Sequence, residues 1–140
     1  MLQKLMFGSY NQRVEKPKSP NDWLCRDRKI VEAYDGDPLC GFPPTAGLVR
    51  DMMEGFRYIQ DPRHLDRMRK DLPVFFIAGK EDPVGAYGSG VETCVKAFRE
   101  AGMTQVACKL YADDRHDILN ELDKRMVWSD VTNWIDSAVD

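Results

Sequence analysis

Residues 73–85 read PVFFIAGKEDPVG, an apolar run followed at once by a polar turn. The run 73–78 is apolar at every position, which is typical of a parallel strand with helices on both of its faces. The turn carries Asp82 within Glu-Asp-Pro, a composition that favours a tight change of direction. This stretch therefore predicts a buried strand that delivers an acidic residue just past its carboxyl end.

A second strand and a second polar loop repeat this pattern. The sequence predicts a helix at about 90–101, a strand at 105–111 that alternates apolar and polar residues, and then a loop that carries His116. Strand, helix and strand of these lengths form a right-handed parallel crossover. The predicted fold class is therefore α/β, with Asp82 and His116 at the edge of the sheet where α/β folds build their sites.

The aspartate and the histidine have a specific chemistry if their side chains meet. Asp82 would accept a hydrogen bond from one ring nitrogen of His116 and fix the tautomer, which leaves the other nitrogen free to act as a base. Each residue alone has an ordinary interpretation too, because loop histidines are often solvated and aspartates often form turns. His64 follows no such strand and is interpreted as a helix-surface residue.

A metal site is the competing interpretation of the histidine loop. Asp113, Asp114, His116 and Asp117 are neighbours in that loop, but they come without a cysteine or a second histidine. We therefore predict neither a metal nor another cofactor.

The first half of the chain predicts helices and loops. Helices are expected at 27–34, 45–60 and 62–70, and the one at 45–60 carries apolar side chains at helical spacing. Its methionine-rich stripe is interpreted as core, and the alternative is that it lines a greasy pocket that accepts varied chains. On that alternative the substrate-binding residues are Phe42, Met52, Met53 and Phe56.

The last predicted element is an amphipathic helix at 123–138. Its inward-facing residues are expected to be Val127, Val131, Trp134, Ile135 and Ala138.

Composition narrows the class of protein. With 140 residues, of which 43% are hydrophobic, the chain has room for one domain with a real core. A net charge of −3 argues against nucleic-acid binding, and no apolar run is long enough to span a membrane. Because the four cysteines include no Cys-x-x-Cys pair, we expect reduced thiols and a cytoplasmic protein.

The two polar turns resemble those of monoacylglycerol-lipase-like, lysophospholipase-type α/β-hydrolases. The segment 79–91, GKEDPVGAYGSGV, is similar to the acid turn of that family, and 109–121, KLYADDRHDILNE, is similar to its histidine turn. Segments 23–27 and 34–42 resemble its cap, the helical insertion over the active site. The resemblance covers nearly the whole chain and implies that Asp82 and His116 are the acid and base of a Ser-His-Asp triad.

The resemblance also implies a partial α/β-hydrolase fold. Residues 1–70 would form a helical cap or lid segment, and 71–140 the C-terminal part of the core, a β-α-β unit followed by a helix. In that family the nucleophilic serine and its Gly-x-Ser-x-Gly elbow precede the cap, and no such elbow occurs in these 140 residues. The chain alone is therefore expected to be inactive.

The expected function is that of the C-terminal part of a serine hydrolase that cleaves carboxylic esters of fatty acyl chains. One alternative is a non-catalytic interaction domain that keeps the hydrolase shape. Another is a relative with an aspartate nucleophile, such as an epoxide hydrolase. The expected partners are an acyl ester, the rest of the hydrolase, and a second copy of the chain, because the edge of 73–78 and the helix at 45–60 would otherwise expose apolar surface.

Overall fold

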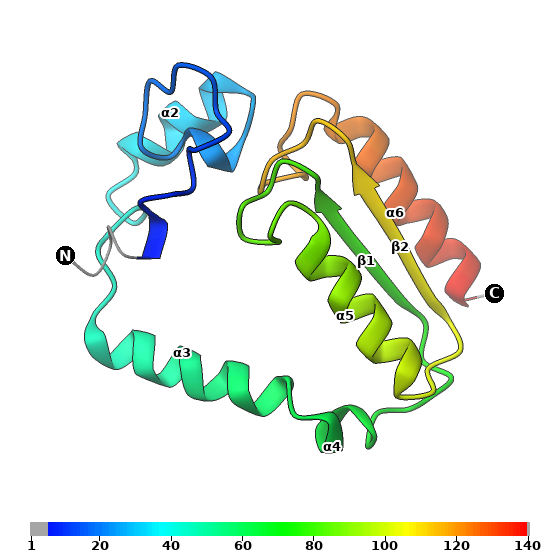
Figure 1. Cartoon of the computed structure of the whole chain (residues 1–140). Helices are drawn as coiled ribbons and strands as arrows, with labels where there is room; N and C mark the ends of the chain where they lie inside the picture. Colours follow the sequence, from blue (N-terminus) through cyan, green and yellow to red (C-terminus); the bar gives the residue numbers. More distant parts are fainter. Residues whose placement is uncertain (1–5, 140) are drawn as a thin grey trace.

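A computed structural model describes residues 6–139 of the chain (Figure 1). Its elements in order are η1 (Asp22–Leu24), α2 (Arg28–Gly36), α3 (Ala46–Ile59), α4 (Pro62–Leu65), β1 (Val74–Gly79), α5 (Ser89–Glu100), β2 (Val106–Tyr111) and α6 (Lys124–Val139).

The sheet consists of β1 and β2, which pair in parallel as predicted. The register runs from Val74 opposite Val106 to Gly79 opposite Tyr111, so both strands end at the same edge. The connection between them is α5, and the strand–helix–strand unit forms the right-hand half of the molecule in Figure 1.

Helices cover both faces of this sheet. Neighbouring residues of β1 point to opposite faces, so each face can be followed through one of its phenylalanines. Phe76 meets Phe98 of α5 edge to face, with ring centroids 5.0 Å apart. Phe75 stacks on Trp134 of α6, with centroids 5.4 Å apart. The apolar run of β1 thus packs on both faces, as its sequence indicated.

The buried face of α6 is centred on Val127, which is fully buried beside Tyr111 and Ile118. The prediction that Ile135 points inward is wrong, since 46% of its surface is exposed. At roughly 100° per residue, Ile135 lies about 80° around the helix from Val127. Within the described residues the sheet has only two strands, so the surface that it offers to α6 is narrow.

The segment before β1 contains a second, smaller core. Trp23 and Leu24 of η1, together with Cys25 directly after it, pack against Val31 of α2. α2 extends two residues beyond the prediction and includes Gly36 in its last turn. Asp27 caps its start by accepting a hydrogen bond from the backbone N–H of Lys29.

α3 and α4 lead from this small core to the sheet. α3 begins at the predicted cap, where the Thr45 hydroxyl accepts from the N–H of Leu48, but none of its residues is buried. The methionine-rich stripe is therefore not core within this chain. α4 is a single turn and ends well before residue 70, because the Lys70 carbonyl already accepts a hydrogen bond from the N–H of Thr104 at the start of the β2 segment.

The four cysteines are free thiols, as predicted. Over the described part of the chain, no helix combines the length and apolarity needed to cross a bilayer.

Candidate active site

Asp82 follows β1 and is almost fully buried. Its Oδ1 accepts a hydrogen bond of 2.8 Å from the N–H of Val84, and its carbonyl accepts one of 2.8 Å from the N–H of Tyr87. The loop closes through three successive residues with positive φ: Ala86, Tyr87 and Gly88. Such left-handed backbone is costly for non-glycine residues and is concentrated at functional sites.

His116 follows β2 and meets Asp82 side chain to side chain. The His116 Nδ1 lies 3.0 Å from Oδ2 of Asp82, which confirms the predicted approach. With Asp82 ionised, the shared proton sits on Nδ1. This hydrogen bond raises the pKa of His116 above its ordinary value, although partial burial acts in the opposite direction. The aspartate thus fixes both the tautomer and the orientation of the ring.

The second ring nitrogen of His116 has the properties of a base. Between residues 6 and 139, no side chain forms a hydrogen bond to Nε2, and the side chain is 40% exposed. A base needs a proton donor within hydrogen-bonding reach, and the hydroxyls of Ser19, Ser89, Ser129 and Ser137 make their hydrogen bonds elsewhere. The pair can accept and release a proton, but its nucleophile lies outside this constellation.

One wall of the histidine comes from residues 22–26 (the η1 segment), part of which the sequence analysis likened to a cap without predicting a contact with His116. The indole of Trp23 packs on the imidazole with ring centroids 5.2 Å apart. The backbone N–H of His116 donates to the carbonyl of Trp23, at 3.5 Å, and the next N–H donates to the carbonyl of Leu24, at 2.7 Å. The histidine loop is therefore docked on this segment through its main chain.

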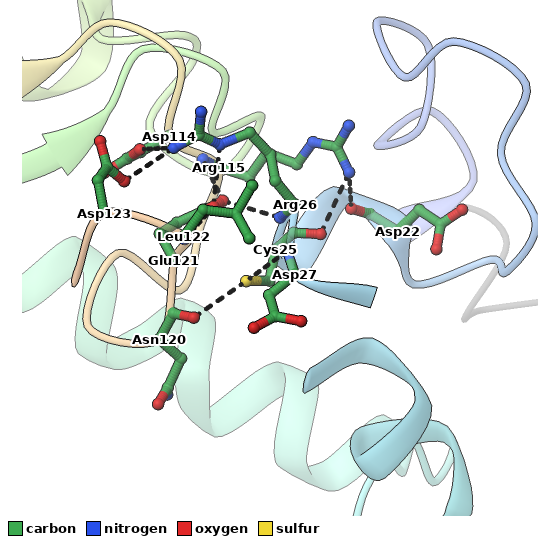
Figure 2. A network of polar contacts seen from close by, with 10 residues as sticks. All are labelled: Asp22, Cys25, Arg26, Asp27, Asp114, Arg115, Asn120, Glu121, Leu122 and Asp123. Carbon is green, nitrogen blue, oxygen red and sulfur yellow. Dashed lines mark hydrogen bonds and ion pairs between the residues drawn. The ribbon is translucent and has the colours of Figure 1, made fainter. Parts of the chain in front are cut away.

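Two arginines connect the η1 segment with the histidine loop, residues 112–123 (Figure 2). Arg26 reaches the carboxylates of the loop: it forms an ion pair with Asp114, and its Nε lies 2.9 Å from Oε2 of Glu121. Arg115 reaches back, and its Nη1 donates to the carbonyls of Asp22, at 2.7 Å, and Cys25, at 3.2 Å. Sequence reasoning missed this network, because its partners lie 88–97 positions apart in the chain.

The acidic cluster at this network is the arrangement that most resembles a metal site. Asp114, Glu121 and Asp123 each place a carboxylate oxygen within 4.8 Å of the others. The guanidinium of Arg26 contacts all three carboxylates and supplies the positive charge. The cluster shares only Asp114 with the metal interpretation of the loop, which used Asp113, Asp114, His116 and Asp117, and the cation at the cluster is the guanidinium of Arg26.

An open cleft of about 660 Å³ lies beside Trp23. Its lining is mostly apolar and includes Phe7, Trp23, Tyr34, Leu39, Phe42 and Leu48. Of the four predicted substrate-binding residues, Phe42 lines this cleft, while Met52, Met53 and Phe56 do not. The three lie further along α3, where Met53 and Phe56 are 44% and 42% exposed. The structure therefore separates the predicted set into a cleft residue and an exposed helix stripe.

His64 lies apart from the pair, as predicted. Its ring stacks on Tyr58 with centroids 3.8 Å apart, and its Nδ1 lies 2.6 Å from the carbonyl of the same residue.

Comparison with known proteins places this geometry. The family described as serine aminopeptidase, S33, matches residues 1–123. A thermostable carboxyl esterase from Bacillus coagulans, solved with glycerol, is 28% identical with a TM-score of 0.82 over 98% of this chain. A lipase in its open form is 25% identical with a TM-score of 0.81 over 96% of this chain. The chain spans 45% and 44% of the lengths of these two structures. No curated protein matches the sequence.

Proposed function

The chain belongs to the α/β-hydrolase family described as serine aminopeptidase, S33, and from this premise we propose that it is the C-terminal part of a serine hydrolase that cleaves carboxylic esters. The observation that carries the proposal is the hydrogen bond between Asp82 and His116 at the carboxyl ends of two adjacent parallel strands. Likeness to an esterase and a lipase favours esters over the peptides that the family description suggests.

In the proposed mechanism His116 transfers one proton in each half of the reaction. Its Nε2 takes the proton of the serine hydroxyl as the serine oxygen attacks the ester carbonyl, and gives it to the leaving alcohol when the ester C–O bond breaks. Water then attacks the acyl carbonyl, Nε2 takes a proton from the water and gives it to the serine oxygen as the acyl–serine bond breaks, and the carboxylic acid is released. Asp82 stabilises the imidazolium throughout, which is the role that its buried carboxylate suits. The serine and the oxyanion donors belong to the rest of the hydrolase.

We propose that the substrate carries a fatty acyl chain, of the lysophospholipase or monoacylglycerol lipase type. The support is the apolar cleft, whose wall Trp23 is shared with His116. An apolar cleft favours an aliphatic chain because burial of each methylene is worth about 0.8 kcal/mol. Phe42 is the predicted binding residue that this cleft supports, and Met52, Met53 and Phe56 are proposed to extend the apolar surface along α3.

We propose that the remainder of the hydrolase pairs with the open edge of β1. β2 occupies one edge of β1, and no strand of the described segment pairs with the other. An unpaired edge of apolar residues is a template for another strand. When that remainder is absent we expect two copies of the chain to associate through this edge, and light scattering that shows a monomer at high micromolar concentration would contradict this.

The function is tested with chromogenic acyl esters of increasing chain length. We expect no turnover by the 140-residue chain alone, and turnover by a longer form that contains the rest of the hydrolase. Replacement of His116 by alanine in the longer form should abolish that turnover. Turnover by the chain alone would place a nucleophile within it. A longer form that binds a protein partner but hydrolyses no ester would support the interaction-domain alternative.

A further inference from the structure

Glu121 is fully buried and lies outside the catalytic pair, yet its carboxylate accepts four hydrogen bonds. Oε1 accepts from the backbone N–H of Arg26, at 2.9 Å, and of Arg115, at 3.1 Å. Oε2 accepts from Nε of Arg26, at 2.9 Å, and from the N–H of Leu122, at 3.1 Å. One carboxylate thus joins Arg26 of the η1 segment to Arg115 and Leu122 of the histidine loop (Figure 2).

These bonds act on the residue directly before His116. The N–H of Arg115 donates to Glu121, while the Arg115 guanidinium donates to the carbonyls of Asp22 and Cys25 in the η1 segment. The N–H of His116 itself donates to the same segment. The direction in which the imidazole leaves the backbone is therefore set by main-chain bonds that Glu121 and Arg26 organise.

The same network reaches the acid turn. Arg26 forms an ion pair with Asp114, and the Asp114 carbonyl accepts a hydrogen bond of 2.9 Å from the N–H of Glu81, the residue before Asp82. The two loops that carry the catalytic pair are thus tied to one arginine–glutamate unit. A buried charge pair is weak evidence for stability by itself, because removing both charges from water costs about as much as their attraction returns. A positioning role explains why the charges are there.

We propose that Glu121 and Arg26 are positioning residues that hold the His116 imidazole against Asp82. Neither contacts the imidazole, and both act on the chemistry through it. The proposal rests on the proposed function in that His116 is the base. Its test uses the ring itself rather than turnover.

The test is an NMR titration of the two histidines of the chain, with His64 as the internal reference. The first variant combines Arg26→Met with Glu121→Gln, which removes a positive and a negative charge together and leaves the net charge unchanged. If the pair positions His116, the raised pKa of this ring moves down toward the ordinary histidine value in the folded double variant.

The single substitution Arg26→Met separates positioning from electrostatics. Loss of a cation alone would raise the pKa of His116, whereas loss of the hydrogen bond to Asp82 lowers it. Arg26→Lys should retain part of the positioning, so the pKa of His116 should move down by less than in Arg26→Met. This variant keeps the test decisive if Arg26→Met fails to fold. Lys96→Met combined with Glu100→Gln is the matched control, since it removes an exposed ion pair of α5 that is not part of the network and also leaves the net charge unchanged.

Two outcomes overturn different statements. An unchanged His116 pKa in the folded double variant and in Arg26→Lys shows that the network is structural only. Asp82→Asn is the benchmark for full loss of the hydrogen bond. If Asp82→Asn also leaves the pKa of His116 unchanged, the catalytic pair itself is absent and the proposed function fails.

Discussion

The indole of Trp23 and the imidazole of His116 pack together with ring centroids 5.2 Å apart, although 93 positions separate them in the chain. Trp23 is 8% exposed and belongs to the small core that also contains Leu24 and Val31. The wall of the histidine is therefore as rigid as that core. Residues before β1 thus contribute directly to the edge of the sheet that carries Asp82 and His116.

We expect Trp23→Ala to destabilise the chain by about 3–5 kcal/mol, since it removes a buried aromatic side chain from a packed core. Trp128→Ala is the control, because Trp128 is 46% exposed and lies on α6. Urea unfolding of both variants measures the difference. Equal losses of unfolding free energy in the two variants would contradict the view that Trp23 anchors the η1 segment.

Gly79 has no room for a side chain, because a Cβ would lie 2.0 Å from the carbonyl oxygen of Asp114 and 2.3 Å from that of Arg115. Gly79→Ala must push the histidine loop away from β1. We expect a cost of about 3 kcal/mol or more, at the upper end of overpacking, together with loss of the hydrogen bond between Asp82 and His116.

Gly55→Ala is the matched control for this substitution, since nothing lies within 4 Å of a Cβ at that position of α3. Alanine is a better helix former than glycine by about 0.8–1 kcal/mol, so this variant should be more stable than the parent. Thermal unfolding of the two variants should therefore shift in opposite directions. A Gly79→Ala chain as stable as the parent would show that the loop accommodates the methyl group.

The extent to which the sequence predicted these features follows from the range of the interactions. The apolar run of β1 and the alternation of β2 are local patterns, and they predicted both strands to within one residue. Asp82 and His116 were predictable because parallel strands end at one edge. The bond between Arg26 and Glu121 joins residues 95 positions apart, and no periodicity reports which distant charges meet. Ile135 was misplaced because helical spacing does not reveal how wide the sheet is.

The pair of Asp82 and His116 should make stability depend on pH. The pKa of His116 is raised in the folded chain, so the stability that this contributes is fully present below the ordinary pKa of 6.5 and is lost as pH rises through the folded value. In Asp82→Asn this loss should disappear. Because His116 is partly exposed, we expect a difference of about 1 kcal/mol or less. Urea unfolding at pH 6 and pH 9 measures it, and parallel behaviour of the two proteins would contradict the prediction.

The cleft should bind a medium-length fatty acid through its apolar wall. Phe42→Ala should weaken binding of decanoate by about tenfold, since burial of a large apolar side chain is worth about 1.5–3 kcal/mol. Ile59→Ala is the control, as Ile59 is 59% exposed and Phe42 is 65% exposed, but Ile59 lies outside the cleft. Calorimetric titration compares the two variants. Weakening by Ile59→Ala but not by Phe42→Ala would indicate that decanoate binds along α3 instead of in the cleft, and equal weakening by both would contradict a specific role of Phe42.

The buried carboxyl of Asp114 should also make stability depend on pH. Burial raises the pKa of its carboxyl from 3.8 to about 7, and the neighbouring Asp123 and Glu121 add to this, while Arg26 opposes it. The folded chain therefore holds this proton more tightly than the unfolded chain, so the stability it contributes is present below pH 3.8 and is lost as pH rises toward 7. At about 1.4 kcal/mol per pKa unit, the loss amounts to a few kcal/mol at most.

Asp114→Asn keeps an acceptor for Arg26 but cannot ionise, so its unfolding free energy should fall less between pH 4 and pH 8 than that of the parent. Asp51→Asn, at an exposed position of α3, should behave like the parent in the same urea experiments. If Asp114→Asn instead loses as much stability as the parent over that range, the carboxylate of Asp114 is already ionised at pH 4 and its ion pair with Arg26 outweighs the cost of burial.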